Sequence, residues 1–230
     1  MEPRLALIVG AGNGLSASLA RLFARHNVQV ALAARTPERL AALCAETGAA
    51  SFACEAAEPE EVAGLFDAIV GSLGEPDVVI YNASARARGP IGSLVPEDVA
   101  RAIAVSAYGG FLVGQQAARL MVAKGAGTIL FTGASASVKG YPQSSAFAMG
   151  KFALRGLAQS MARELAPQGV HVGHVVIDGA IRNPGRAEPV DAPDSMLDPD
   201  AIAATYWHLI GQDRSAWTWE VEVRPWVERF

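Results

Sequence analysis

Short apolar runs of strand length alternate with stretches of helical periodicity along most of this chain, and that alternation constrains the fold more than any other feature. Strands separated by helices pair in parallel, and helices then cover both faces of the sheet. We therefore expect an α/β fold with a doubly wound parallel sheet, three layers and about seven strands. The expected strands are Leu5–Val9, Val28–Ala33, Ala50–Cys54, Val78–Tyr81, Gly127–Thr132, Val170–Ile177 and Glu220–Arg224. The expected helices are Leu15–His26, Pro37–Glu46, Pro59–Ser72, Pro96–Lys124, Ser144–Ala166 and Pro199–Gly211.

The chain is expected to form a single domain over residues 1–230, since 51% of its residues are hydrophobic and no linker divides it. Residues Arg182–Pro199 are rich in Pro, Asp, Glu and Gly and lack periodicity, which predicts a long loop of the kind that often serves as a lid. We expect no bound metal, because His171 and His174 lie three apart in a predicted strand and point to opposite faces.

The charge balance argues against partners that are polyanions. Nineteen Lys and Arg against 23 Asp and Glu give a net charge of -4, which predicts no binding to nucleic acid or to a membrane surface. The first apolar run, Leu5–Val9, is far shorter than a signal sequence or a membrane span of ~20 residues. A cytoplasmic location is therefore expected.

A glycine-rich turn follows the first predicted strand and leads directly into a helix. Gly10 permits a tight turn, Gly14 allows close approach of a diphosphate, and Asn13 and Leu15 flank the start of the helix. The amino end of a helix presents free N–H groups and a positive dipole to such an anion. The alternative is an ordinary strand-to-helix turn that needs a positive φ. The position, at the carboxyl end of a strand, favours nucleotide binding.

Four motifs together resemble the short-chain dehydrogenase/reductase family over nearly the whole chain, which implies a Rossmann-type sheet. They are Gly10-xxx-Gly14-x-Ser16, Tyr81-Asn82-Ala83-Ser84, Phe147-xxx-Lys151 and Asp178-Gly179. Several positions depart from the family pattern: Val9 replaces Thr, Ser16 replaces the third Gly and Ser84 replaces the Gly of NNAG.

The resemblance implies a dinucleotide cofactor, with NADP(H) favoured over NAD(H). The second strand ends without the acid that would bind a ribose hydroxyl, and Arg35 follows it, where a guanidinium can pair with a 2′-phosphate. A solvated Arg is the alternative. The family pattern further predicts which residues contact the cofactor. Glu55 and Ala56 would lie at the adenine, and Asn82 and Ala83 where the strand order of the sheet reverses. Lys151 would also contact the cofactor, and the residues beside the nicotinamide would be Asp178, Gly179 and Ile181.

The catalytic residues of the family match this chain at one position only. Its Tyr, Ser, Lys and Asn fall on Phe147, Ala134, Lys151 and Ser106. Phe147 has no ionisable proton and Ala134 has no hydroxyl, so ordinary carbonyl turnover is expected to be impaired. Ser135 could replace the missing hydroxyl if the loop shifts by one residue. Lys151, if desolvated, could act as an acid with a lowered pKa.

Three functions remain open at this point. The first is an NADP(H)-dependent oxidoreductase with an atypical site, acting on a small carbonyl, enone or imine substrate. The second is a catalytically impaired dinucleotide-binding sensor or partner subunit, and the third is a structural dimerisation module. The family pattern also implies a homodimer or homotetramer built on Ala102–Ala118 and Ser144–Ala166. Trp217, Trp219, Trp226 and Phe230 are expected to be buried at the sheet edge or against a neighbouring subunit.

Overall fold

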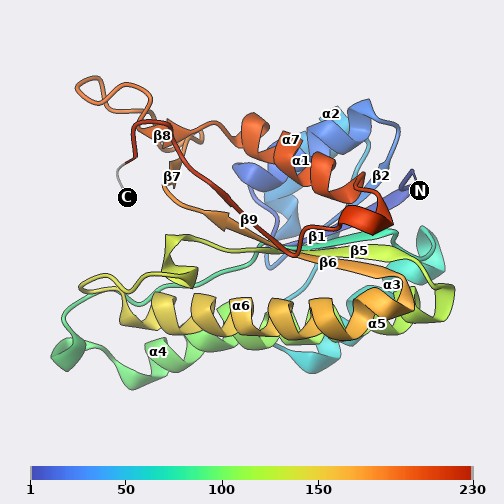
Figure 1. The fold of residues 1–230 in the computed structure, drawn as a ribbon, viewed down its shortest axis with the longest axis horizontal. Coiled ribbons are helices and arrows are strands. Elements are labelled where there is room, and N and C mark those ends of the chain that lie inside the picture. Colours follow the sequence, from blue (N-terminus) through green and yellow to red (C-terminus); the bar gives the residue numbers. More distant parts are fainter. Residues whose placement is uncertain (1, 229–230) are drawn as a thin grey trace.

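The computed structural model describes residues 2–228 and has the expected α/β architecture, a seven-stranded parallel sheet between two layers of helices (Figure 1). The strands run in the order β3-β2-β1-β4-β5-β6-β9. Their bounds are β1 Leu5–Val9, β2 Gln29–Ala34, β3 Ala50–Ala53, β4 Val78–Tyr81, β5 Gly127–Thr132, β6 Val170–Ile177 and β9 Glu220–Val223. The order reverses between β1 and β4, so ligands of such a sheet bind beyond the carboxyl ends of these strands.

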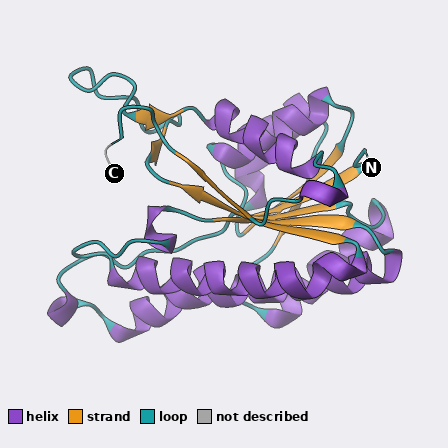
Figure 2. Ribbon diagram, viewed as in Figure 1, coloured by secondary structure: helices purple, strands orange, loops and turns teal. Residues whose placement is uncertain are grey.

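Alternating side chains of each strand divide the core into two halves. The helices are α1 Leu15–Arg25, α2 Ala41–Thr47, α3 Pro59–Ser72, α4 Pro96–Ile103, α5 Gly109–Lys124, α6 Ser145–Leu165 and α7 Pro199–Ile210. In β1, Leu5, Leu7 and Val9 face α3, α5 and α6, whereas Ala6 and Ile8 face α1, α2 and α7. Figure 2 shows these helices above and below the sheet. Both faces of the sheet are therefore buried, which explains the continuous apolar runs in its strands.

Strands β1, β4, β5 and β6 have the predicted bounds, and the other three differ by one residue at one or both ends. The predicted helix over Pro37–Glu46 is a 3-10 helix, Pro37–Leu40, that leads into α2. These differences lie at element ends, where the pattern of apolar residues is least informative.

Two predictions need correction. The single helix expected over Pro96–Lys124 is α4 and α5 joined by a wide π-helical turn at Ala104–Tyr108. The loop expected over Arg182–Pro199 contains β8 (Met196–Leu197), which pairs in parallel with β7 (Ala180–Ile181). The pairing partner is supplied by the segment just after β6, and two-residue strands carry no periodicity of their own.

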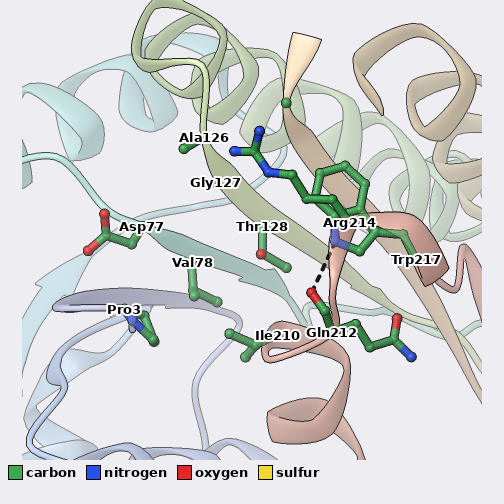
Figure 3. Close-up of a pocket in the computed structure, with 11 residues that line it drawn as sticks. Pro3, Asp77, Val78, Ala126, Gly127, Thr128, Ile210, Gln212, Arg214 and Trp217 are labelled. Atoms are coloured by element: carbon green, nitrogen blue, oxygen red, sulfur yellow. Dashed lines mark hydrogen bonds between the residues drawn. The ribbon is translucent and has the colours of Figure 1, made fainter. Parts of the chain in front are cut away.

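The amino ends of the strands surround a small cavity of about 90 Å³. Figure 3 shows Arg214 and Trp217 on one side of it and Asp77 on the other. Trp217 Nε1 donates to the Gln212 carbonyl oxygen at 3.3 Å, and Asp77 pairs with Lys124. This cavity lies at the end of the sheet opposite to the switch point, so we do not assign a site to it.

Two of the four C-terminal aromatic residues predicted to be buried pack against neighbouring side chains. Trp217 stacks on His171, and Trp219 lies under the Arg155 guanidinium. Trp226 is 83% exposed, and Phe230 lies outside the described residues. Among the helices of residues 2–228, none has the length and apolar character needed to cross a membrane.

Candidate functional site

The glycine-rich turn is held rigidly against the end of β4. Gly10 has φ +86°, and a Cβ atom there would overlap the backbone of Ala83. Ser16 Oγ donates to the Gly10 carbonyl oxygen at 3.2 Å, and Asn82 Nδ2 donates to Ser16 Oγ at 2.8 Å. Gly14 caps α1 without any side-chain hydrogen bond. The amino end of α1 is thus an open, pre-formed cradle of the kind that receives a phosphate.

An outer cavity of about 630 Å³ lies beyond the carboxyl ends of β1 to β4. Six predicted cofactor residues line it: Gly10, Arg35, Glu55, Ala56, Asn82 and Ala83. The Arg35 guanidinium is 4.0 Å from the Glu55 carboxylate and 76% exposed. The Glu55 N–H donates to Glu61 at 2.6 Å, which fixes the backbone at the end of β3.

An inner cavity of about 270 Å³ adjoins the outer one, and both are lined by Asn82. Six more predicted residues line it: Gly14, Leu15, Phe147, Lys151, Gly179 and Ile181. Phe147 and Lys151 lie one turn apart on α6 and therefore share a face of the helix. The fold thus brings residues from β1 to β6 together in one continuous cleft.

Lys151 is the chemically distinctive group of the inner cavity. Its side chain is 2% exposed, and Nζ donates to the Thr132 carbonyl oxygen at 2.6 Å. Nζ also lies 5.9 Å from the centre of the Phe147 ring. Burial, together with the nearby positive charge of Arg86, lowers the pKa of Lys151 from 10.5 to about 7. An amine with such a pKa can exchange a proton near neutral pH.

The loop after β5 is fixed from beneath by a buried polar network. Burial lowers the pKa of His174 to about 4, so this ring is neutral near pH 7. Its Nδ1 donates to Glu220 at 3.0 Å, and Nε2 lies 3.4 Å from the Ser137 hydroxyl. Glu220 in turn accepts two hydrogen bonds from Arg155, at 2.6 and 2.8 Å. This network positions the loop segment that carries Ala134 and Ser135 at the cavity.

A recess beside the inner cavity is lined by Ser135, Tyr141 and Phe147. The Ser135 hydroxyl and Lys139 both donate to the Asp178 carboxylate, which lowers the pKa of Asp178. Asp178 and Gly179 are both predicted to lie beside the nicotinamide. Gly179 lines the inner cavity and the recess, whereas the Asp178 carboxylate accepts hydrogen bonds from Ser135 and Lys139.

Two further predicted residues do not belong to the lining of these cavities. Asn13 is exposed on the glycine-rich turn. Ser106 is fully buried in the wide turn, where its hydroxyl donates to the Ala85 carbonyl oxygen at 3.3 Å and accepts from the Ala85 N–H at 3.2 Å. Ser106 therefore holds the segment after β4 instead of facing Lys151.

The cavities also include residues that the motifs did not identify, although Asn183 and Arg186 fall in the predicted loop over Arg182–Pro199. Arg101 lines the outer cavity, and Arg86, Asn183 and Arg186 line the inner one. The Asn183 Cβ lies 3.8 Å from the Cβ position of Gly14, so the segment after β7 closes over the glycine-rich turn. No periodicity marks these residues, because all but Arg101 lie in loops.

Comparisons with known proteins agree with this geometry. A family model described as short chain dehydrogenase matches residues 4–188. Momilactone A synthase of Oryza sativa subsp. japonica is 32% identical over 208 residues, 87% of this chain and 73% of that protein. A short-chain dehydrogenase from Rhodopseudomonas palustris is 36% identical, with a TM-score of 0.83 over 96% of this chain and 98% of that one.

A second solved structure, a metagenomic short-chain oxidoreductase in complex with NADP, is 28% identical to this chain. The match covers 96% of this chain and 97% of that one with a TM-score of 0.84. Together with the cleft at the switch point, these matches identify the protein as a member of the short-chain dehydrogenase family.

Proposed function

We propose that the protein is an NADP(H)-dependent oxidoreductase with an atypical active site, in which Lys151 is the proton-exchanging group at the reacting centre. The observation that carries the proposal is the position of Lys151, buried against the Thr132 carbonyl beneath a cleft that runs from Arg35 to Phe147. A bound nicotinamide cofactor would supply the hydride.

The cleft fits a dinucleotide by the chemistry of its lining. The glycine-rich turn and the uncapped amino end of α1 suit a diphosphate, and Gly10 leaves no room for a side chain there. Arg35 and Arg101 place two guanidinium groups in the outer cavity. Arg101 is paired with Asp98 at 2.6 Å, whereas the contact of Arg35 with Glu55 is 4.0 Å, so Arg35 is the better candidate for a 2′-phosphate. Glu55 and Ala56 would then lie at the adenine, as the family pattern implies.

At the inner end, Lys151 would bind the ribose next to the nicotinamide and deliver or accept a proton, directly or through water. Phe147 offers no proton, and Ala134 offers no hydroxyl to a developing oxyanion. Reduction of an activated carbon–carbon double bond or an imine suits such a site better than reduction of a simple ketone, because hydride transfer then carries more of the reaction. Gly179 and Ile181 would lie against the nicotinamide.

A catalytically impaired sensor or partner subunit is the second candidate. Phe147 and Ala134 favour this candidate, because they lack the groups that ordinarily transfer the proton and stabilise the oxyanion.

Helices α5 and α6 expose apolar side chains, with Phe111 41% and Phe152 46% exposed. We propose that these two helices join two or four copies of the chain.

The experiment that tests the proposal combines a binding titration with an activity screen. NADPH and NADH are titrated into the protein by calorimetry, and NADPH consumption is followed with aldehydes, ketones, enones and imines. Binding of NADPH with turnover of at least one compound is the expected result. Binding without turnover favours the sensor, and the absence of binding to either cofactor contradicts both.

A further inference from the structure

Three arginines gather at the mouth of the inner cavity without a carboxylate to neutralise them. Arg86 lines both the inner cavity and the recess, Arg88 lines the recess, and Arg186 lines the inner cavity. Within residues 2–228, no Asp or Glu oxygen lies within 4.0 Å of their guanidinium groups. Two other arginines at this end of the sheet are paired, Arg182 with Asp198 at 2.9 Å and Arg101 with Asp98 at 2.6 Å.

The position of Arg86 is fixed by the apolar ring below it. Its guanidinium carbon lies 4.1 Å from the centre of the Phe147 ring, a stacked cation–π arrangement. Partial burial and the positive charges of Arg88 and Arg186 lower the pKa of Arg86. Lys151 lines the same cavity as Arg86 and is close enough to feel its charge. Like charges in such proximity repel one another in the free protein, so an anion bound among them would relieve the repulsion.

We propose that the substrate of this enzyme carries a carboxylate, which binds to Arg86 and Arg88 while its apolar part lies against Phe147. This inference rests on the proposed function, and it names the substrate class for that site. Guanidinium groups bind carboxylates through two parallel hydrogen bonds and so orient them. Because the anion is held beside Phe147 and Lys151, the reducible bond of a small keto acid, unsaturated acid or imino acid would lie at the inner cavity.

The same anion chemistry could come from the diphosphate of the cofactor, since Arg186 shares the inner cavity with Gly14. Arg88 distinguishes the two sources. It lines the recess with Tyr141 and Pro142, and the lining of that recess does not include the glycine-rich turn. Replacing Arg86 and Arg88 together therefore tests substrate binding more than cofactor binding.

The test uses benzoate as the probe and benzamide, its neutral counterpart of nearly equal shape, as the control. Both are titrated by calorimetry into the wild type and into an Arg86→Gln/Arg88→Gln variant, with and without NADPH. Arg182→Gln is the matched control, because it removes a paired arginine that lines a different cavity at the same end of the sheet. The Kd of NADPH and the thermal midpoint are measured for every variant.

The expected result is that the wild type binds benzoate about tenfold or more tightly than benzamide, the difference for a charge-assisted pair. The double variant loses this preference while it keeps the NADPH affinity and thermal midpoint of the wild type, and Arg182→Gln retains all three. Equal binding of benzoate and benzamide by the wild type would overturn the inference. A double variant that loses NADPH affinity but keeps the benzoate preference would also overturn it. Failure of NADPH to bind, in contrast, contradicts the proposed function and is recorded independently.

Discussion

The two ends of the cleft differ in how closely they keep to the family pattern. At the outer end, the turn around Gly10 and Gly14 is locked by Ser16 and Asn82, and six of the residues predicted to bind the cofactor line the cavity. At the inner end, Lys151 matches the family pattern, whereas by that pattern Phe147 and Ala134 would take the places of an acid and a hydroxyl. Under the proposed function, cofactor binding and chemistry diverge separately within one fold, and each of the following predictions tests one side of this contrast.

The largest effect is expected from returning the two missing groups to the inner end. The double variant Ala134→Ser/Phe147→Tyr should reduce simple carbonyl compounds about 10²-fold faster than the wild type, since it supplies a proton donor and an oxyanion ligand. NADPH consumption with an aldehyde measures this. Phe152→Tyr adds a hydroxyl on the exposed face of α6 and is the control. No gain in the double variant would mean that Ser106 or the loop after β5 also limits the reaction.

Lys151 is proposed both to hold the cofactor and to exchange a proton, so its removal should affect cofactor binding as well as chemistry. Lys151→Ala is expected to weaken NADPH binding about 10- to 100-fold, the range for losing hydrogen bonds from a charged group. Calorimetry measures the Kd, and a thermal melt checks that the variant is folded. An unchanged Kd would remove Lys151 from the cofactor site.

The pKa of Lys151 also makes a prediction about stability. In the unfolded chain this lysine titrates near 10.5, and in the folded protein near 7, so between these values the unfolded state binds more protons. The wild type should therefore gain stability relative to Lys151→Met as pH rises from 7 to 10, by up to about 1.4 kcal/mol per pH unit. Urea unfolding of both proteins measures the difference. A difference that is independent of pH would show that Lys151 is charged in the fold.

The smallest effect is expected at the outer end, where Arg35 is mostly exposed. Arg35→Ala should lower the preference for NADPH over NADH about fivefold, because a solvated ion pair contributes roughly 1 kcal/mol. The ratio of the two Kd values reports it. Arg25→Ala, at the opposite end of α1, should leave the ratio as in the wild type. A preference that survives in Arg35→Ala would point to Arg101 as the phosphate ligand.

Strands and the glycine-rich turn could be predicted from the sequence because local rules determine them. Strands buried on both faces form unbroken apolar runs, and the turn has its own glycine spacing. The wide turn at Ala104–Tyr108 was not predicted, because one extra residue in an Ala- and Gly-rich helix hardly changes its periodicity. The arginine cluster was not predicted either, since Arg86 and Arg186 are a hundred residues apart and only the fold brings them together.

The wide turn has a consequence for how this chain can vary in length. Tyr81 donates its hydroxyl proton to the Val105 carbonyl, and Ser106 holds Ala85, so the turn is fastened on two sides. Deleting one residue here would restore a regular helix but rotate α4 by roughly 100° about its axis, carrying Arg101 away from the cleft. Insertions and deletions should therefore be selected against at Ala104–Tyr108, whereas the tip of the loop before β8, where Val190 is fully exposed, should tolerate changes in length.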